Sequence, residues 1–377
     1  MRKSLLAWLA AGTALTGTAL AGAPAMAQTA PGTGVTELSD IVVTANRREE
    51  RLQHVPTAVQ AITAETTKQR GVVDLQTLRT AIPSLTFDRQ TNAATPFLRG
   101  VGTQTGSLSN EPSIALYVDN VYIGTGMGSL FDFNNISRIE VLKGPQGTLF
   151  GRNAVGGVIH VLTRDPTHEP SMDVDMGIAN YKTWSANLYA TGSLSDTLAA
   201  NVALHATKRG DGWGRNLNTG NDTYRMSDYA ARVKLLWTPT DDTRVLLSGD
   251  VDQYKGDEGI TRTMIPGTFS HPATGAAAVG NPGFYNALNS VDAFNNVHIA
   301  GASLQVGHGL GAVNLTSITP YRSLHSKNAL DSDALPRVTQ QVFIRNRLHT
   351  FTQELQLKSA TESRLSWILG GYFFRST

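Results

Sequence analysis

The sequence of 377 residues contains no cysteine, and this absence excludes several kinds of site. A chain without cysteine forms no disulfide, offers no thiolate to a metal and carries no lipid on an amino-terminal cysteine. Charge is also scarce, because 16% of the residues are charged and the formal net charge is +2. This near-neutral balance gives no reason to expect nucleic acid as a partner.

Motifs of catalysis and cofactor binding are missing as well. No G-x-S-x-G turn occurs, and HEPSM at 168–172 has no second histidine at the spacing of a zinc protease. GTGMG at 124–128 lacks the spacing of a dinucleotide-binding loop. The sequence therefore predicts no catalytic residue, no metal site and no cofactor, and we expect a protein that is not an enzyme.

The glycine-rich segment GPQGTLFGRN at 144–153 also fails as a phosphate-binding loop. That loop needs lysine and a hydroxyl residue directly after its second glycine. Here Lys143 precedes the loop, and Arg152 and Asn153 follow Gly151. Another role has to explain these glycines.

Residues 1–27 have the composition of a secretory signal peptide. Two basic residues precede an apolar run at 5–20, and Ala25-Met26-Ala27 fits a cleavage site that leaves Gln28 as the first mature residue. An amino-terminal membrane anchor is the alternative. No later segment has the roughly 18 uninterrupted apolar residues of a membrane helix, so a membrane location would require strands.

Residues 28–50 are predicted to form a flexible tail that contains one short β-branched segment. Small and polar residues without periodicity fill 28–39, and Ile41-Val42-Val43-Thr44 follows. The unpaired backbone of such a segment can add to the sheet edge of another protein. The alternative is an ordinary first strand of the domain behind it.

Residues 51–168 are predicted to form a small α/β domain. Leu75, Leu78 and Ile82 have helical spacing before Pro83. Strands are expected at 114–118 and 121–123, joined by a turn at Asp119-Asn120, and two more at 137–144 and 156–163.

From residue 169 to 377 the hydrophobic pattern changes to a period of two. In 184–194 and 229–238 apolar and polar residues alternate, and strands are joined in turn by short polar turns and by long loops at 208–225 and 255–297. This arrangement is typical of the wall of an outer-membrane barrel. A soluble β-sandwich is the alternative, but it rarely needs such long loops at every second connection.

From Asp40 to the carboxyl end the chain resembles the TonB-dependent outer-membrane receptors. The segment RIEVLKGPQGTLFGRNAVGGVI at 138–159 carries the most specific part of this resemblance, with DIVVTA at 40–45 and LYVDNVYIG at 116–124. The resemblance implies a plug domain lodged in a 22-stranded transmembrane β-barrel. It also implies energy coupling through the periplasm-spanning protein TonB, which pairs with a TonB box.

Position by position, the resemblance makes Asp40, Ile41, Val42, Val43, Thr44 and Ala45 the TonB box. It assigns architectural plug turns to five glycines, for which positive backbone angles are accessible: Gly144, Gly147, Gly151, Gly156 and Gly157. Gly100 also belongs to the plug motif. It suggests that some charged motif residues lie between plug and wall while others face water: Arg99, Arg138, Glu140, Lys143 and Arg152.

The resemblance further implies a receptor in the outer membrane that takes up a scarce nutrient, most commonly a ferric siderophore. Ligand contacts are expected at plug loops 90–95, 103–111 and 124–130, with Thr103, Gln104 and Asn110 as candidates. They are also expected in external loops of the wall, with Trp213 and Arg215 as candidates. Cobalamin, sugar and aromatic-compound receptors share the same motifs. The expected partners are TonB, outer-membrane lipid and the nutrient, without nucleic acid.

The wall is shorter than the resemblance requires. About nine candidate strands follow residue 170, and the sequence stops at YFFRST within a strand. We therefore expect a complete plug and a partial barrel with two open edges, the product of truncation. A non-transporting plug fragment that acts as a periplasmic binding module is the alternative. Residues 28–39 are too few to fold as a separate signalling domain.

Overall fold

The structure of the chain is a computed structural model, which describes residues 41–48, 50–72, 74–75, 77–90, 93–103, 110–126, 135–257, 261, 283–360 and 365–377. The predicted signal peptide, the tail up to Asp40, and Gln104 lie outside the described residues. Residues 41–377 form one compact unit. That unit contains a small mixed domain, the plug, and a long antiparallel sheet, the wall.

The plug is built on a five-stranded sheet with the order β3-β9-β10-β7-β8. Strand β10 runs parallel to β7, and the other neighbours are antiparallel. The strands are β3 (Val59–Thr63), β7 (Ile114–Val118), β8 (Val121–Ile123), β9 (Ile136–Lys143) and β10 (Gly157–Thr163). The predicted hairpin is confirmed, because Asp119 and Asn120 form its turn with φ of 47° and 67°.

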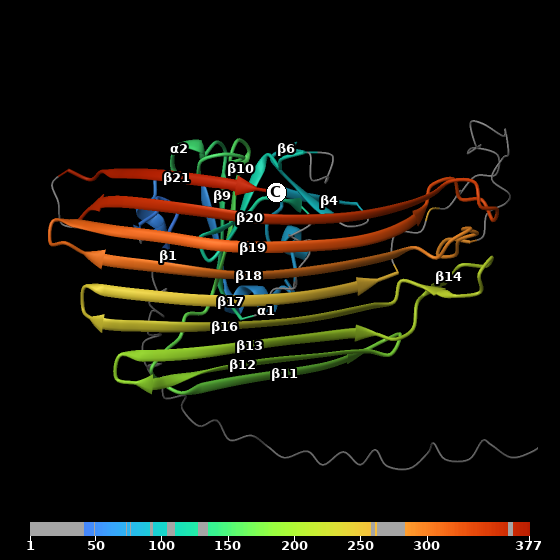
Figure 1. The fold of residues 1–377 in the computed structure, drawn as a ribbon, viewed down its shortest axis with the longest axis horizontal. Helices are drawn as coiled ribbons and strands as arrows, with labels where there is room; N and C mark the ends of the chain where they lie inside the picture. Colours follow the sequence, from blue (N-terminus) through green and yellow to red (C-terminus); the bar gives the residue numbers. More distant parts are fainter. Residues whose placement is uncertain are drawn as a thin grey trace, which may run out of the picture. The chain divides into compact units, whose positions relative to one another are not determined.

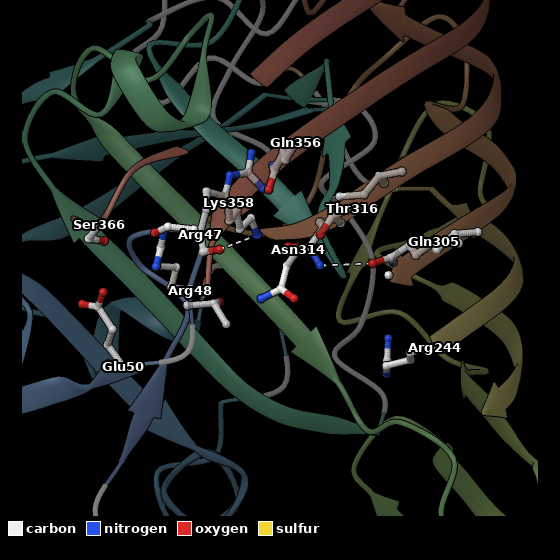
Figure 2. A pocket seen from close by; sticks show the side chains of 16 residues that line it. Arg47, Arg48, Glu50, Arg244, Gln305, Asn314, Thr316, Gln356, Lys358 and Ser366 are labelled. Atoms are coloured by element: carbon white, nitrogen blue, oxygen red, sulfur yellow. Dashed lines mark hydrogen bonds between the residues drawn. The ribbon is translucent and has the colours of Figure 1, made fainter. Parts of the chain in front are cut away.

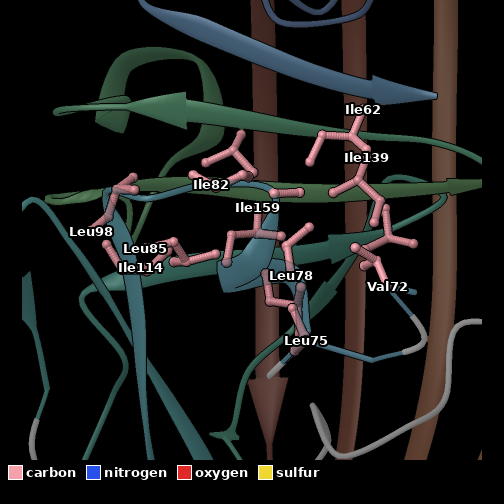
Figure 3. Packing of buried hydrophobic residues seen from close by; sticks show 14 of the residues in the cluster. Ile62, Val72, Leu75, Leu78, Ile82, Leu85, Leu98, Ile114, Ile139 and Ile159 are labelled. Atoms are coloured by element: carbon pink, nitrogen blue, oxygen red, sulfur yellow. The ribbon is translucent and has the colours of Figure 1, made fainter. Parts of the chain in front are cut away.

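Both faces of this sheet are covered by apolar side chains. Figure 3 shows one face, where Leu78 and Ile82 pack against Ile139 and Ile159 of the sheet. The other face carries Tyr117, Leu142 and Phe150. The burial of two faces explains why β7 and β8 carry apolar residues at every position.

The helical region of the plug differs from the sequence prediction. The helix α1 spans Ala64–Gln69, where Thr63 accepts a hydrogen bond from the backbone N–H of Thr66, and the segment around Leu78 forms the short 3-10 helix η2 (Thr77–Thr80). Gly71 follows α1 with a φ of 61°. The spacing of Leu75, Leu78 and Ile82 therefore reflects one buried face of an irregular turn.

Short elements complete the plug. They are β1 (Val42–Val43), β2 (Glu50–Arg51), η1 (Leu52–His54), β4 (Leu85–Gln90), β5 (Ala93–Leu98), β6 (Val101–Gly102) and α2 (Gly147–Phe150). Strands β1 and β2 form a hairpin, and β4, β5 and β6 form a small three-stranded sheet.

The wall is one antiparallel sheet of nine strands in chain order, as Figure 1 shows. They are β11 (Ser171–Ala179), β12 (Thr183–Ser195), β13 (Leu198–Arg209), β16 (Met226–Thr240), β17 (Thr243–Gly256), β18 (Phe294–Gly309), β19 (Val313–Asp331), β20 (Gln341–Ser359) and β21 (Ile368–Ser376). This confirms the prediction of a plug followed by antiparallel barrel-type strands.

The two ends of the wall differ in their connections. Two residues join β12 to β13 and β16 to β17, whereas β13 leads to β16 through residues 210–225, which include β14 (Gly214–Arg215) and β15 (Asp222–Thr223). We call the end of the wall with the two-residue connections the turn end, and the opposite end the loop end. Leu235, Leu247 and Leu304 face one side of the wall, the outer face, and Lys234 and Gln305 face the other. No helix among the described residues is long and apolar enough to cross a membrane.

Candidate functional site

The segment Ile41–Ala45, the ribbon, is packed onto the plug. Val42 and Val43 pair with Arg51 and Glu50 of β2, and the N–H of Leu52 donates to the carbonyl of Ile41 at 2.8 Å. Val43 and Ala45 are 0% and 1% exposed. Burial of β-branched side chains in the plug core holds the ribbon in place.

A buried carboxylate holds the remaining edge of the ribbon. Because Ile41 and Leu52 form a hydrogen-bonded pair, the backbone groups of Val42 and Thr44 point away from β2. The N–H of Thr44 donates to the two carboxylate oxygens of Glu140 at 2.9 and 3.0 Å, and its hydroxyl lies 3.1 and 3.2 Å from them. Glu140 thus occupies the edge at which another strand could add.

Glu140 belongs to a small polar cluster inside the plug. It is 0% exposed, and the Nε of Arg138 donates to it at 2.7 Å. The backbone N–H of Asn120 donates to Nε2 of His160 at 3.2 Å, so the imidazole proton resides on Nδ1, which faces the Thr44 hydroxyl at 3.5 Å. Burial lowers the pKa of His160 to about 3, with a further contribution from the charge of Arg47.

Acidification should weaken the plug through His160. The pKa of His160 is about 3 in the folded chain and 6.5 in the unfolded chain. Between these two pH values the unfolded chain binds a proton on this imidazole and the folded chain does not. The contribution of the neutral imidazole to the free energy of unfolding is therefore fully present above pH 6.5 and decreases as the pH falls. At pH 5 the loss amounts to about 2 kcal/mol. Amide exchange of β9 and β10 at neutral pH and at pH 5 measures this loss. An equal loss in a His160→Gln variant would show that His160 is not the cause.

Arg47 and Arg48, which follow the ribbon, link the chain there to wall strand β20 and to the residue before β21. Arg47 lies 3.6 Å from the carboxylate of Glu354, and its guanidinium stacks 4.3 Å from the ring centre of Phe150. Lys358 donates from Nζ to the carbonyl of Arg47 at 2.6 Å, and Arg48 donates to the carbonyl of Trp367 at 2.7 Å. Movement of the ribbon therefore requires these contacts with the wall to break.

A polar cavity of ≈ 630 Å³ lies beside these contacts, between the ribbon and the wall. Figure 2 shows Arg47, Arg48 and Lys358 on one side of it and Arg244 and Gln305 on the other. The plug is therefore not close-packed against β18 and β19 at this place.

A second link joins the plug hairpin to the middle of the wall. Lys234 of β16 is 0% exposed, and its Nζ lies 3.1 Å from Asp119 and 3.0 Å from Asp165. Burial favours a raised pKa for Asp119, but Lys234 and Arg232 together with the hydrogen bonds from Thr163 hold the pKa below its ordinary value. Gln305 of β18 also donates to the carbonyl of Asp119 at 2.8 Å.

Most of the motif glycines lie at sharp turns or close approaches of the plug, whereas Gly147 begins α2 and has open space around it. Gly151 has a φ of 72° directly after α2. Gly157 has a φ of 149°, and a Cβ there would lie 2.3 Å from the carbonyl oxygen of Leu142. Both positions restrict side chains for steric reasons, which supports an architectural role.

The charged motif residues separate into three environments. Arg138, Glu140 and Lys143 make their contacts within the plug, where Lys143 donates to Gln60 at 2.9 Å. Arg152 reaches the wall, because its guanidinium lies 4.5 Å from the ring centre of Phe374 in β21. Arg99 is exposed. Within the described part of the chain, Arg152 is the one of the five that contacts a wall residue.

The proposed ligand residues do not converge on one pocket within the described part of the chain. The hydroxyl of Thr103 accepts from the N–H of Ser113 at 2.9 Å in the plug, and Asn110 is exposed. Trp213 stacks on Tyr224, and Arg215 donates to the carbonyl of Gly220 at 2.8 Å, both within residues 210–225 at the loop end. Each of these contacts stabilises the loop to which the residue belongs.

The predicted flexible tail requires a correction for residues 41–48 and 50. The sequence predicted an exposed ribbon because four successive β-branched residues carry too little periodicity to reveal a packing partner. The structure instead pairs it with β2 and buries Val43. Glu50 and Arg51, which supply the pairing, carried no strand signal because both are charged.

Comparison with known proteins follows the division into plug and wall. Residues 51–158 match the family model described as TonB-dependent Receptor Plug Domain. The chain is 28% identical over 210 residues to the pesticin receptor of Yersinia pestis, an alignment that covers 54% of this chain and 30% of that protein. It is 29% identical over 179 residues to the iron-regulated outer membrane virulence protein of Vibrio cholerae, covering 45% of this chain and 28% of that protein.

A solved structure shares the fold over a longer stretch. The ferric yersiniabactin uptake receptor FyuA from Yersinia pestis superimposes with a TM-score of 0.72 at 19% identity, covering 85% of this chain and 48% of that one. At this identity the likeness shows the fold alone. The chain spans about half the length of that structure and less than a third of the length of the curated relatives that it matches.

Proposed function

We propose that this chain, which belongs to the TonB-dependent receptors, serves in the energy-coupled uptake of a scarce nutrient across an outer membrane. The observation that carries the proposal is the ribbon Ile41–Ala45, which packs on the plug and reaches wall strand β20 through Arg47. The proposal assigns the chain to transport rather than catalysis.

In this mechanism the ribbon is the TonB box, held at rest by its own plug. TonB adds as a strand to the ribbon edge, and this requires Thr44 to leave Glu140 because the carboxylate occupies that edge. Burial of Val43 and the charge-assisted hydrogen bonds together stabilise the docked form by about 3–6 kcal/mol. The population of the docked ribbon then exceeds that of the free ribbon by about two to four powers of ten.

Force on the released ribbon is transmitted to the plug through the chain itself. Residues 46–58 connect the ribbon to β3, the edge strand of the plug sheet. Plug and wall meet through polar contacts such as Asp119 with Lys234, which hold at rest and re-form after sliding. A seam of this kind yields to force more readily than an apolar one.

A ferric siderophore is the nutrient that we propose. The support comes from the relatives, whose names include an iron-regulated outer membrane protein and a ferric yersiniabactin uptake receptor. Cobalamin, sugars and aromatic compounds remain the alternative substrates, and uptake assays with each of them alongside iron chelates decide among them.

Replacing Val42 with proline tests the energy coupling. The N–H of Val42 points away from β2, toward the edge at which TonB adds, and proline removes this donor and fixes φ, so we expect uptake of the iron chelate to fall at least about tenfold. Val42→Ala is the matched control, because it shortens the exposed side chain and keeps the N–H. Uptake is measured in cells with equal receptor levels in the outer membrane. Equal uptake by the two variants would refute strand addition at this ribbon.

A further inference from the structure

The cavity between the ribbon and the wall owes part of its space to a glycine of β18. Gly307 follows Gln305 at the two-residue alternation of a strand, so both residues face the inner side of the wall. Cross-strand pairing places Gly307 between Arg244 of β17 and Thr316 of β19. A Cβ on Gly307 would have the carbonyl oxygen of Arg244 as its nearest atom outside the adjacent residues, at 3.9 Å. The absent side chain therefore leaves room at the turn end of the inner face.

The lining of this cavity carries an excess of positive charge. It includes one carboxylate, that of Glu50, and four cations, those of Arg47, Arg48, Arg244 and Lys358. Two of the cations have a carboxylate partner outside the lining, because Arg244 pairs with Asp165 and Arg47 lies 3.6 Å from Glu354. Arg48 and Lys358 form no ion pair within the described part of the chain. A partly enclosed site with net positive charge attracts anions.

The hydrogen bonds of three of these cations are incomplete. Arg47 is 8% exposed, and its Nη1 has no hydrogen-bond partner among the described residues. Lys358 donates to a neutral acceptor, the carbonyl of Arg47, at 2.6 Å. Arg48 also donates to neutral oxygens, those of Ser359 at 2.9 Å and Trp367 at 2.7 Å. Because an ammonium has three donors and a guanidinium five, these side chains retain donors for a ligand that brings negative charge.

We propose that this cavity binds a small organic polyanion, a molecule that carries two or more carboxylates or phosphates. Arg48 and Lys358 lie on one side of the cavity and Arg244 lies on the other, as Figure 2 shows. The strands of Arg244 and Lys358 are three strand spacings apart, about 14 Å, so separated anionic groups fit better than a single ion. Asn314 and Thr316 line the cavity as well and offer hydrogen bonds to hydroxyl groups. The volume of ≈ 630 Å³ is typical of a small-molecule site.

A polyanion in this cavity holds the ribbon side of the plug against the wall. Arg48 closely follows the ribbon in the chain, whereas Lys358 and Arg244 belong to wall strands. Charge-assisted hydrogen bonds from both sides to one ligand connect the two parts. The ligand therefore binds the docked ribbon better than the free ribbon, and its binding stabilises the docked form.

Calorimetric titration of the purified, detergent-solubilised protein with citrate and with pyrophosphate tests the site. We expect binding to weaken at least about tenfold in a Lys358→Gln variant, which loses a charge-assisted hydrogen bond. Gly307→Leu keeps every cation and fills the cavity, so it should weaken binding at least as much. Gly307→Ala is its matched control, because the added Cβ fits. A control with Arg70→Gln and Arg79→Gln removes two exposed plug cations outside the cavity lining, and both controls should bind like the native protein.

Hydrogen exchange supplies a second readout, because the Thr44 amide is protected while the ribbon is docked. It should exchange up to about a hundredfold more slowly when the bound probe is present at a hundred times its Kd. Three results would overturn the inference: no binding of either probe, acetate binding as tightly as citrate, or native affinity in the Lys358→Gln or Gly307→Leu variant. Neither assay involves transport or TonB, so a protein that transports normally and binds no polyanion contradicts only this inference.

Discussion

Replacing Lys234 with methionine is expected to loosen the plug in the wall. The ammonium of Lys234 is fully buried and faces two carboxylates, so its removal leaves the buried Asp119 without its nearest cation. Breaking a buried pair in this way costs about 3–5 kcal/mol. Amides of the β7–β8 hairpin should then exchange between about a hundredfold and a few thousandfold faster, as measured by hydrogen exchange.

A second substitution separates charge from packing. In the double variant Lys234→Met with Asp119→Asn, no uncompensated charge remains, and the exchange rates should return most of the way toward those of the native protein. Arg225→Met is the matched control, because Arg225 and its partner Asp257 lie at the loop end of the wall and both side chains are partly exposed. Exchange in the Lys234→Met variant no faster than in this control would contradict the role of the buried pair.

Replacing Glu140 with glutamine is expected to release the ribbon. Glutamine keeps the size of the side chain but removes the charge that receives the Thr44 N–H and the Arg138 guanidinium. Loss of charge-assisted hydrogen bonds costs about 1–3 kcal/mol, so the undocked ribbon should become roughly five- to 150-fold more populated. TonB binding to the purified receptor should tighten by the same factor, since the docked form competes with it.

The control for this variant is Glu65→Gln. Glu65 is an exposed carboxylate of helix α1 that accepts a hydrogen bond from Gln69 and lies outside the ribbon contacts. It should leave TonB affinity unchanged. If Glu140→Gln weakens TonB binding or leaves it unaltered, then the carboxylate does not restrain the ribbon.

The sequence predicted the features that repeat along the chain. Alternation in 229–238 predicted which side chains of β16 face inward, and Lys234 does so. Asp119-Asn120 predicted the plug hairpin because these residue types tolerate positive φ. Both signals are local, which is why single-sequence reasoning reaches them.

The contacts that form the site are not local, and the sequence did not predict them. Glu140 and Thr44 are 96 residues apart, and Arg47 meets Glu354 across most of the chain. A buried Lys234 looked like any inward wall residue until its partners in the plug were known. The sequence offered one indication: a lysine on the inner face requires a carboxylate partner when it is buried, and several aspartates could be that partner.

A reversible tether on the ribbon tests the central claim most directly. Val42 and Arg51 form a non-hydrogen-bonded pair, whose Cα separation of about 4.5 Å suits a disulfide, and the chain contains no other cysteine. In a Val42→Cys, Arg51→Cys variant we expect oxidation to abolish uptake of the iron chelate and a reductant to restore it, while each single variant transports normally. Full uptake with the disulfide intact would show that the ribbon works without leaving the plug.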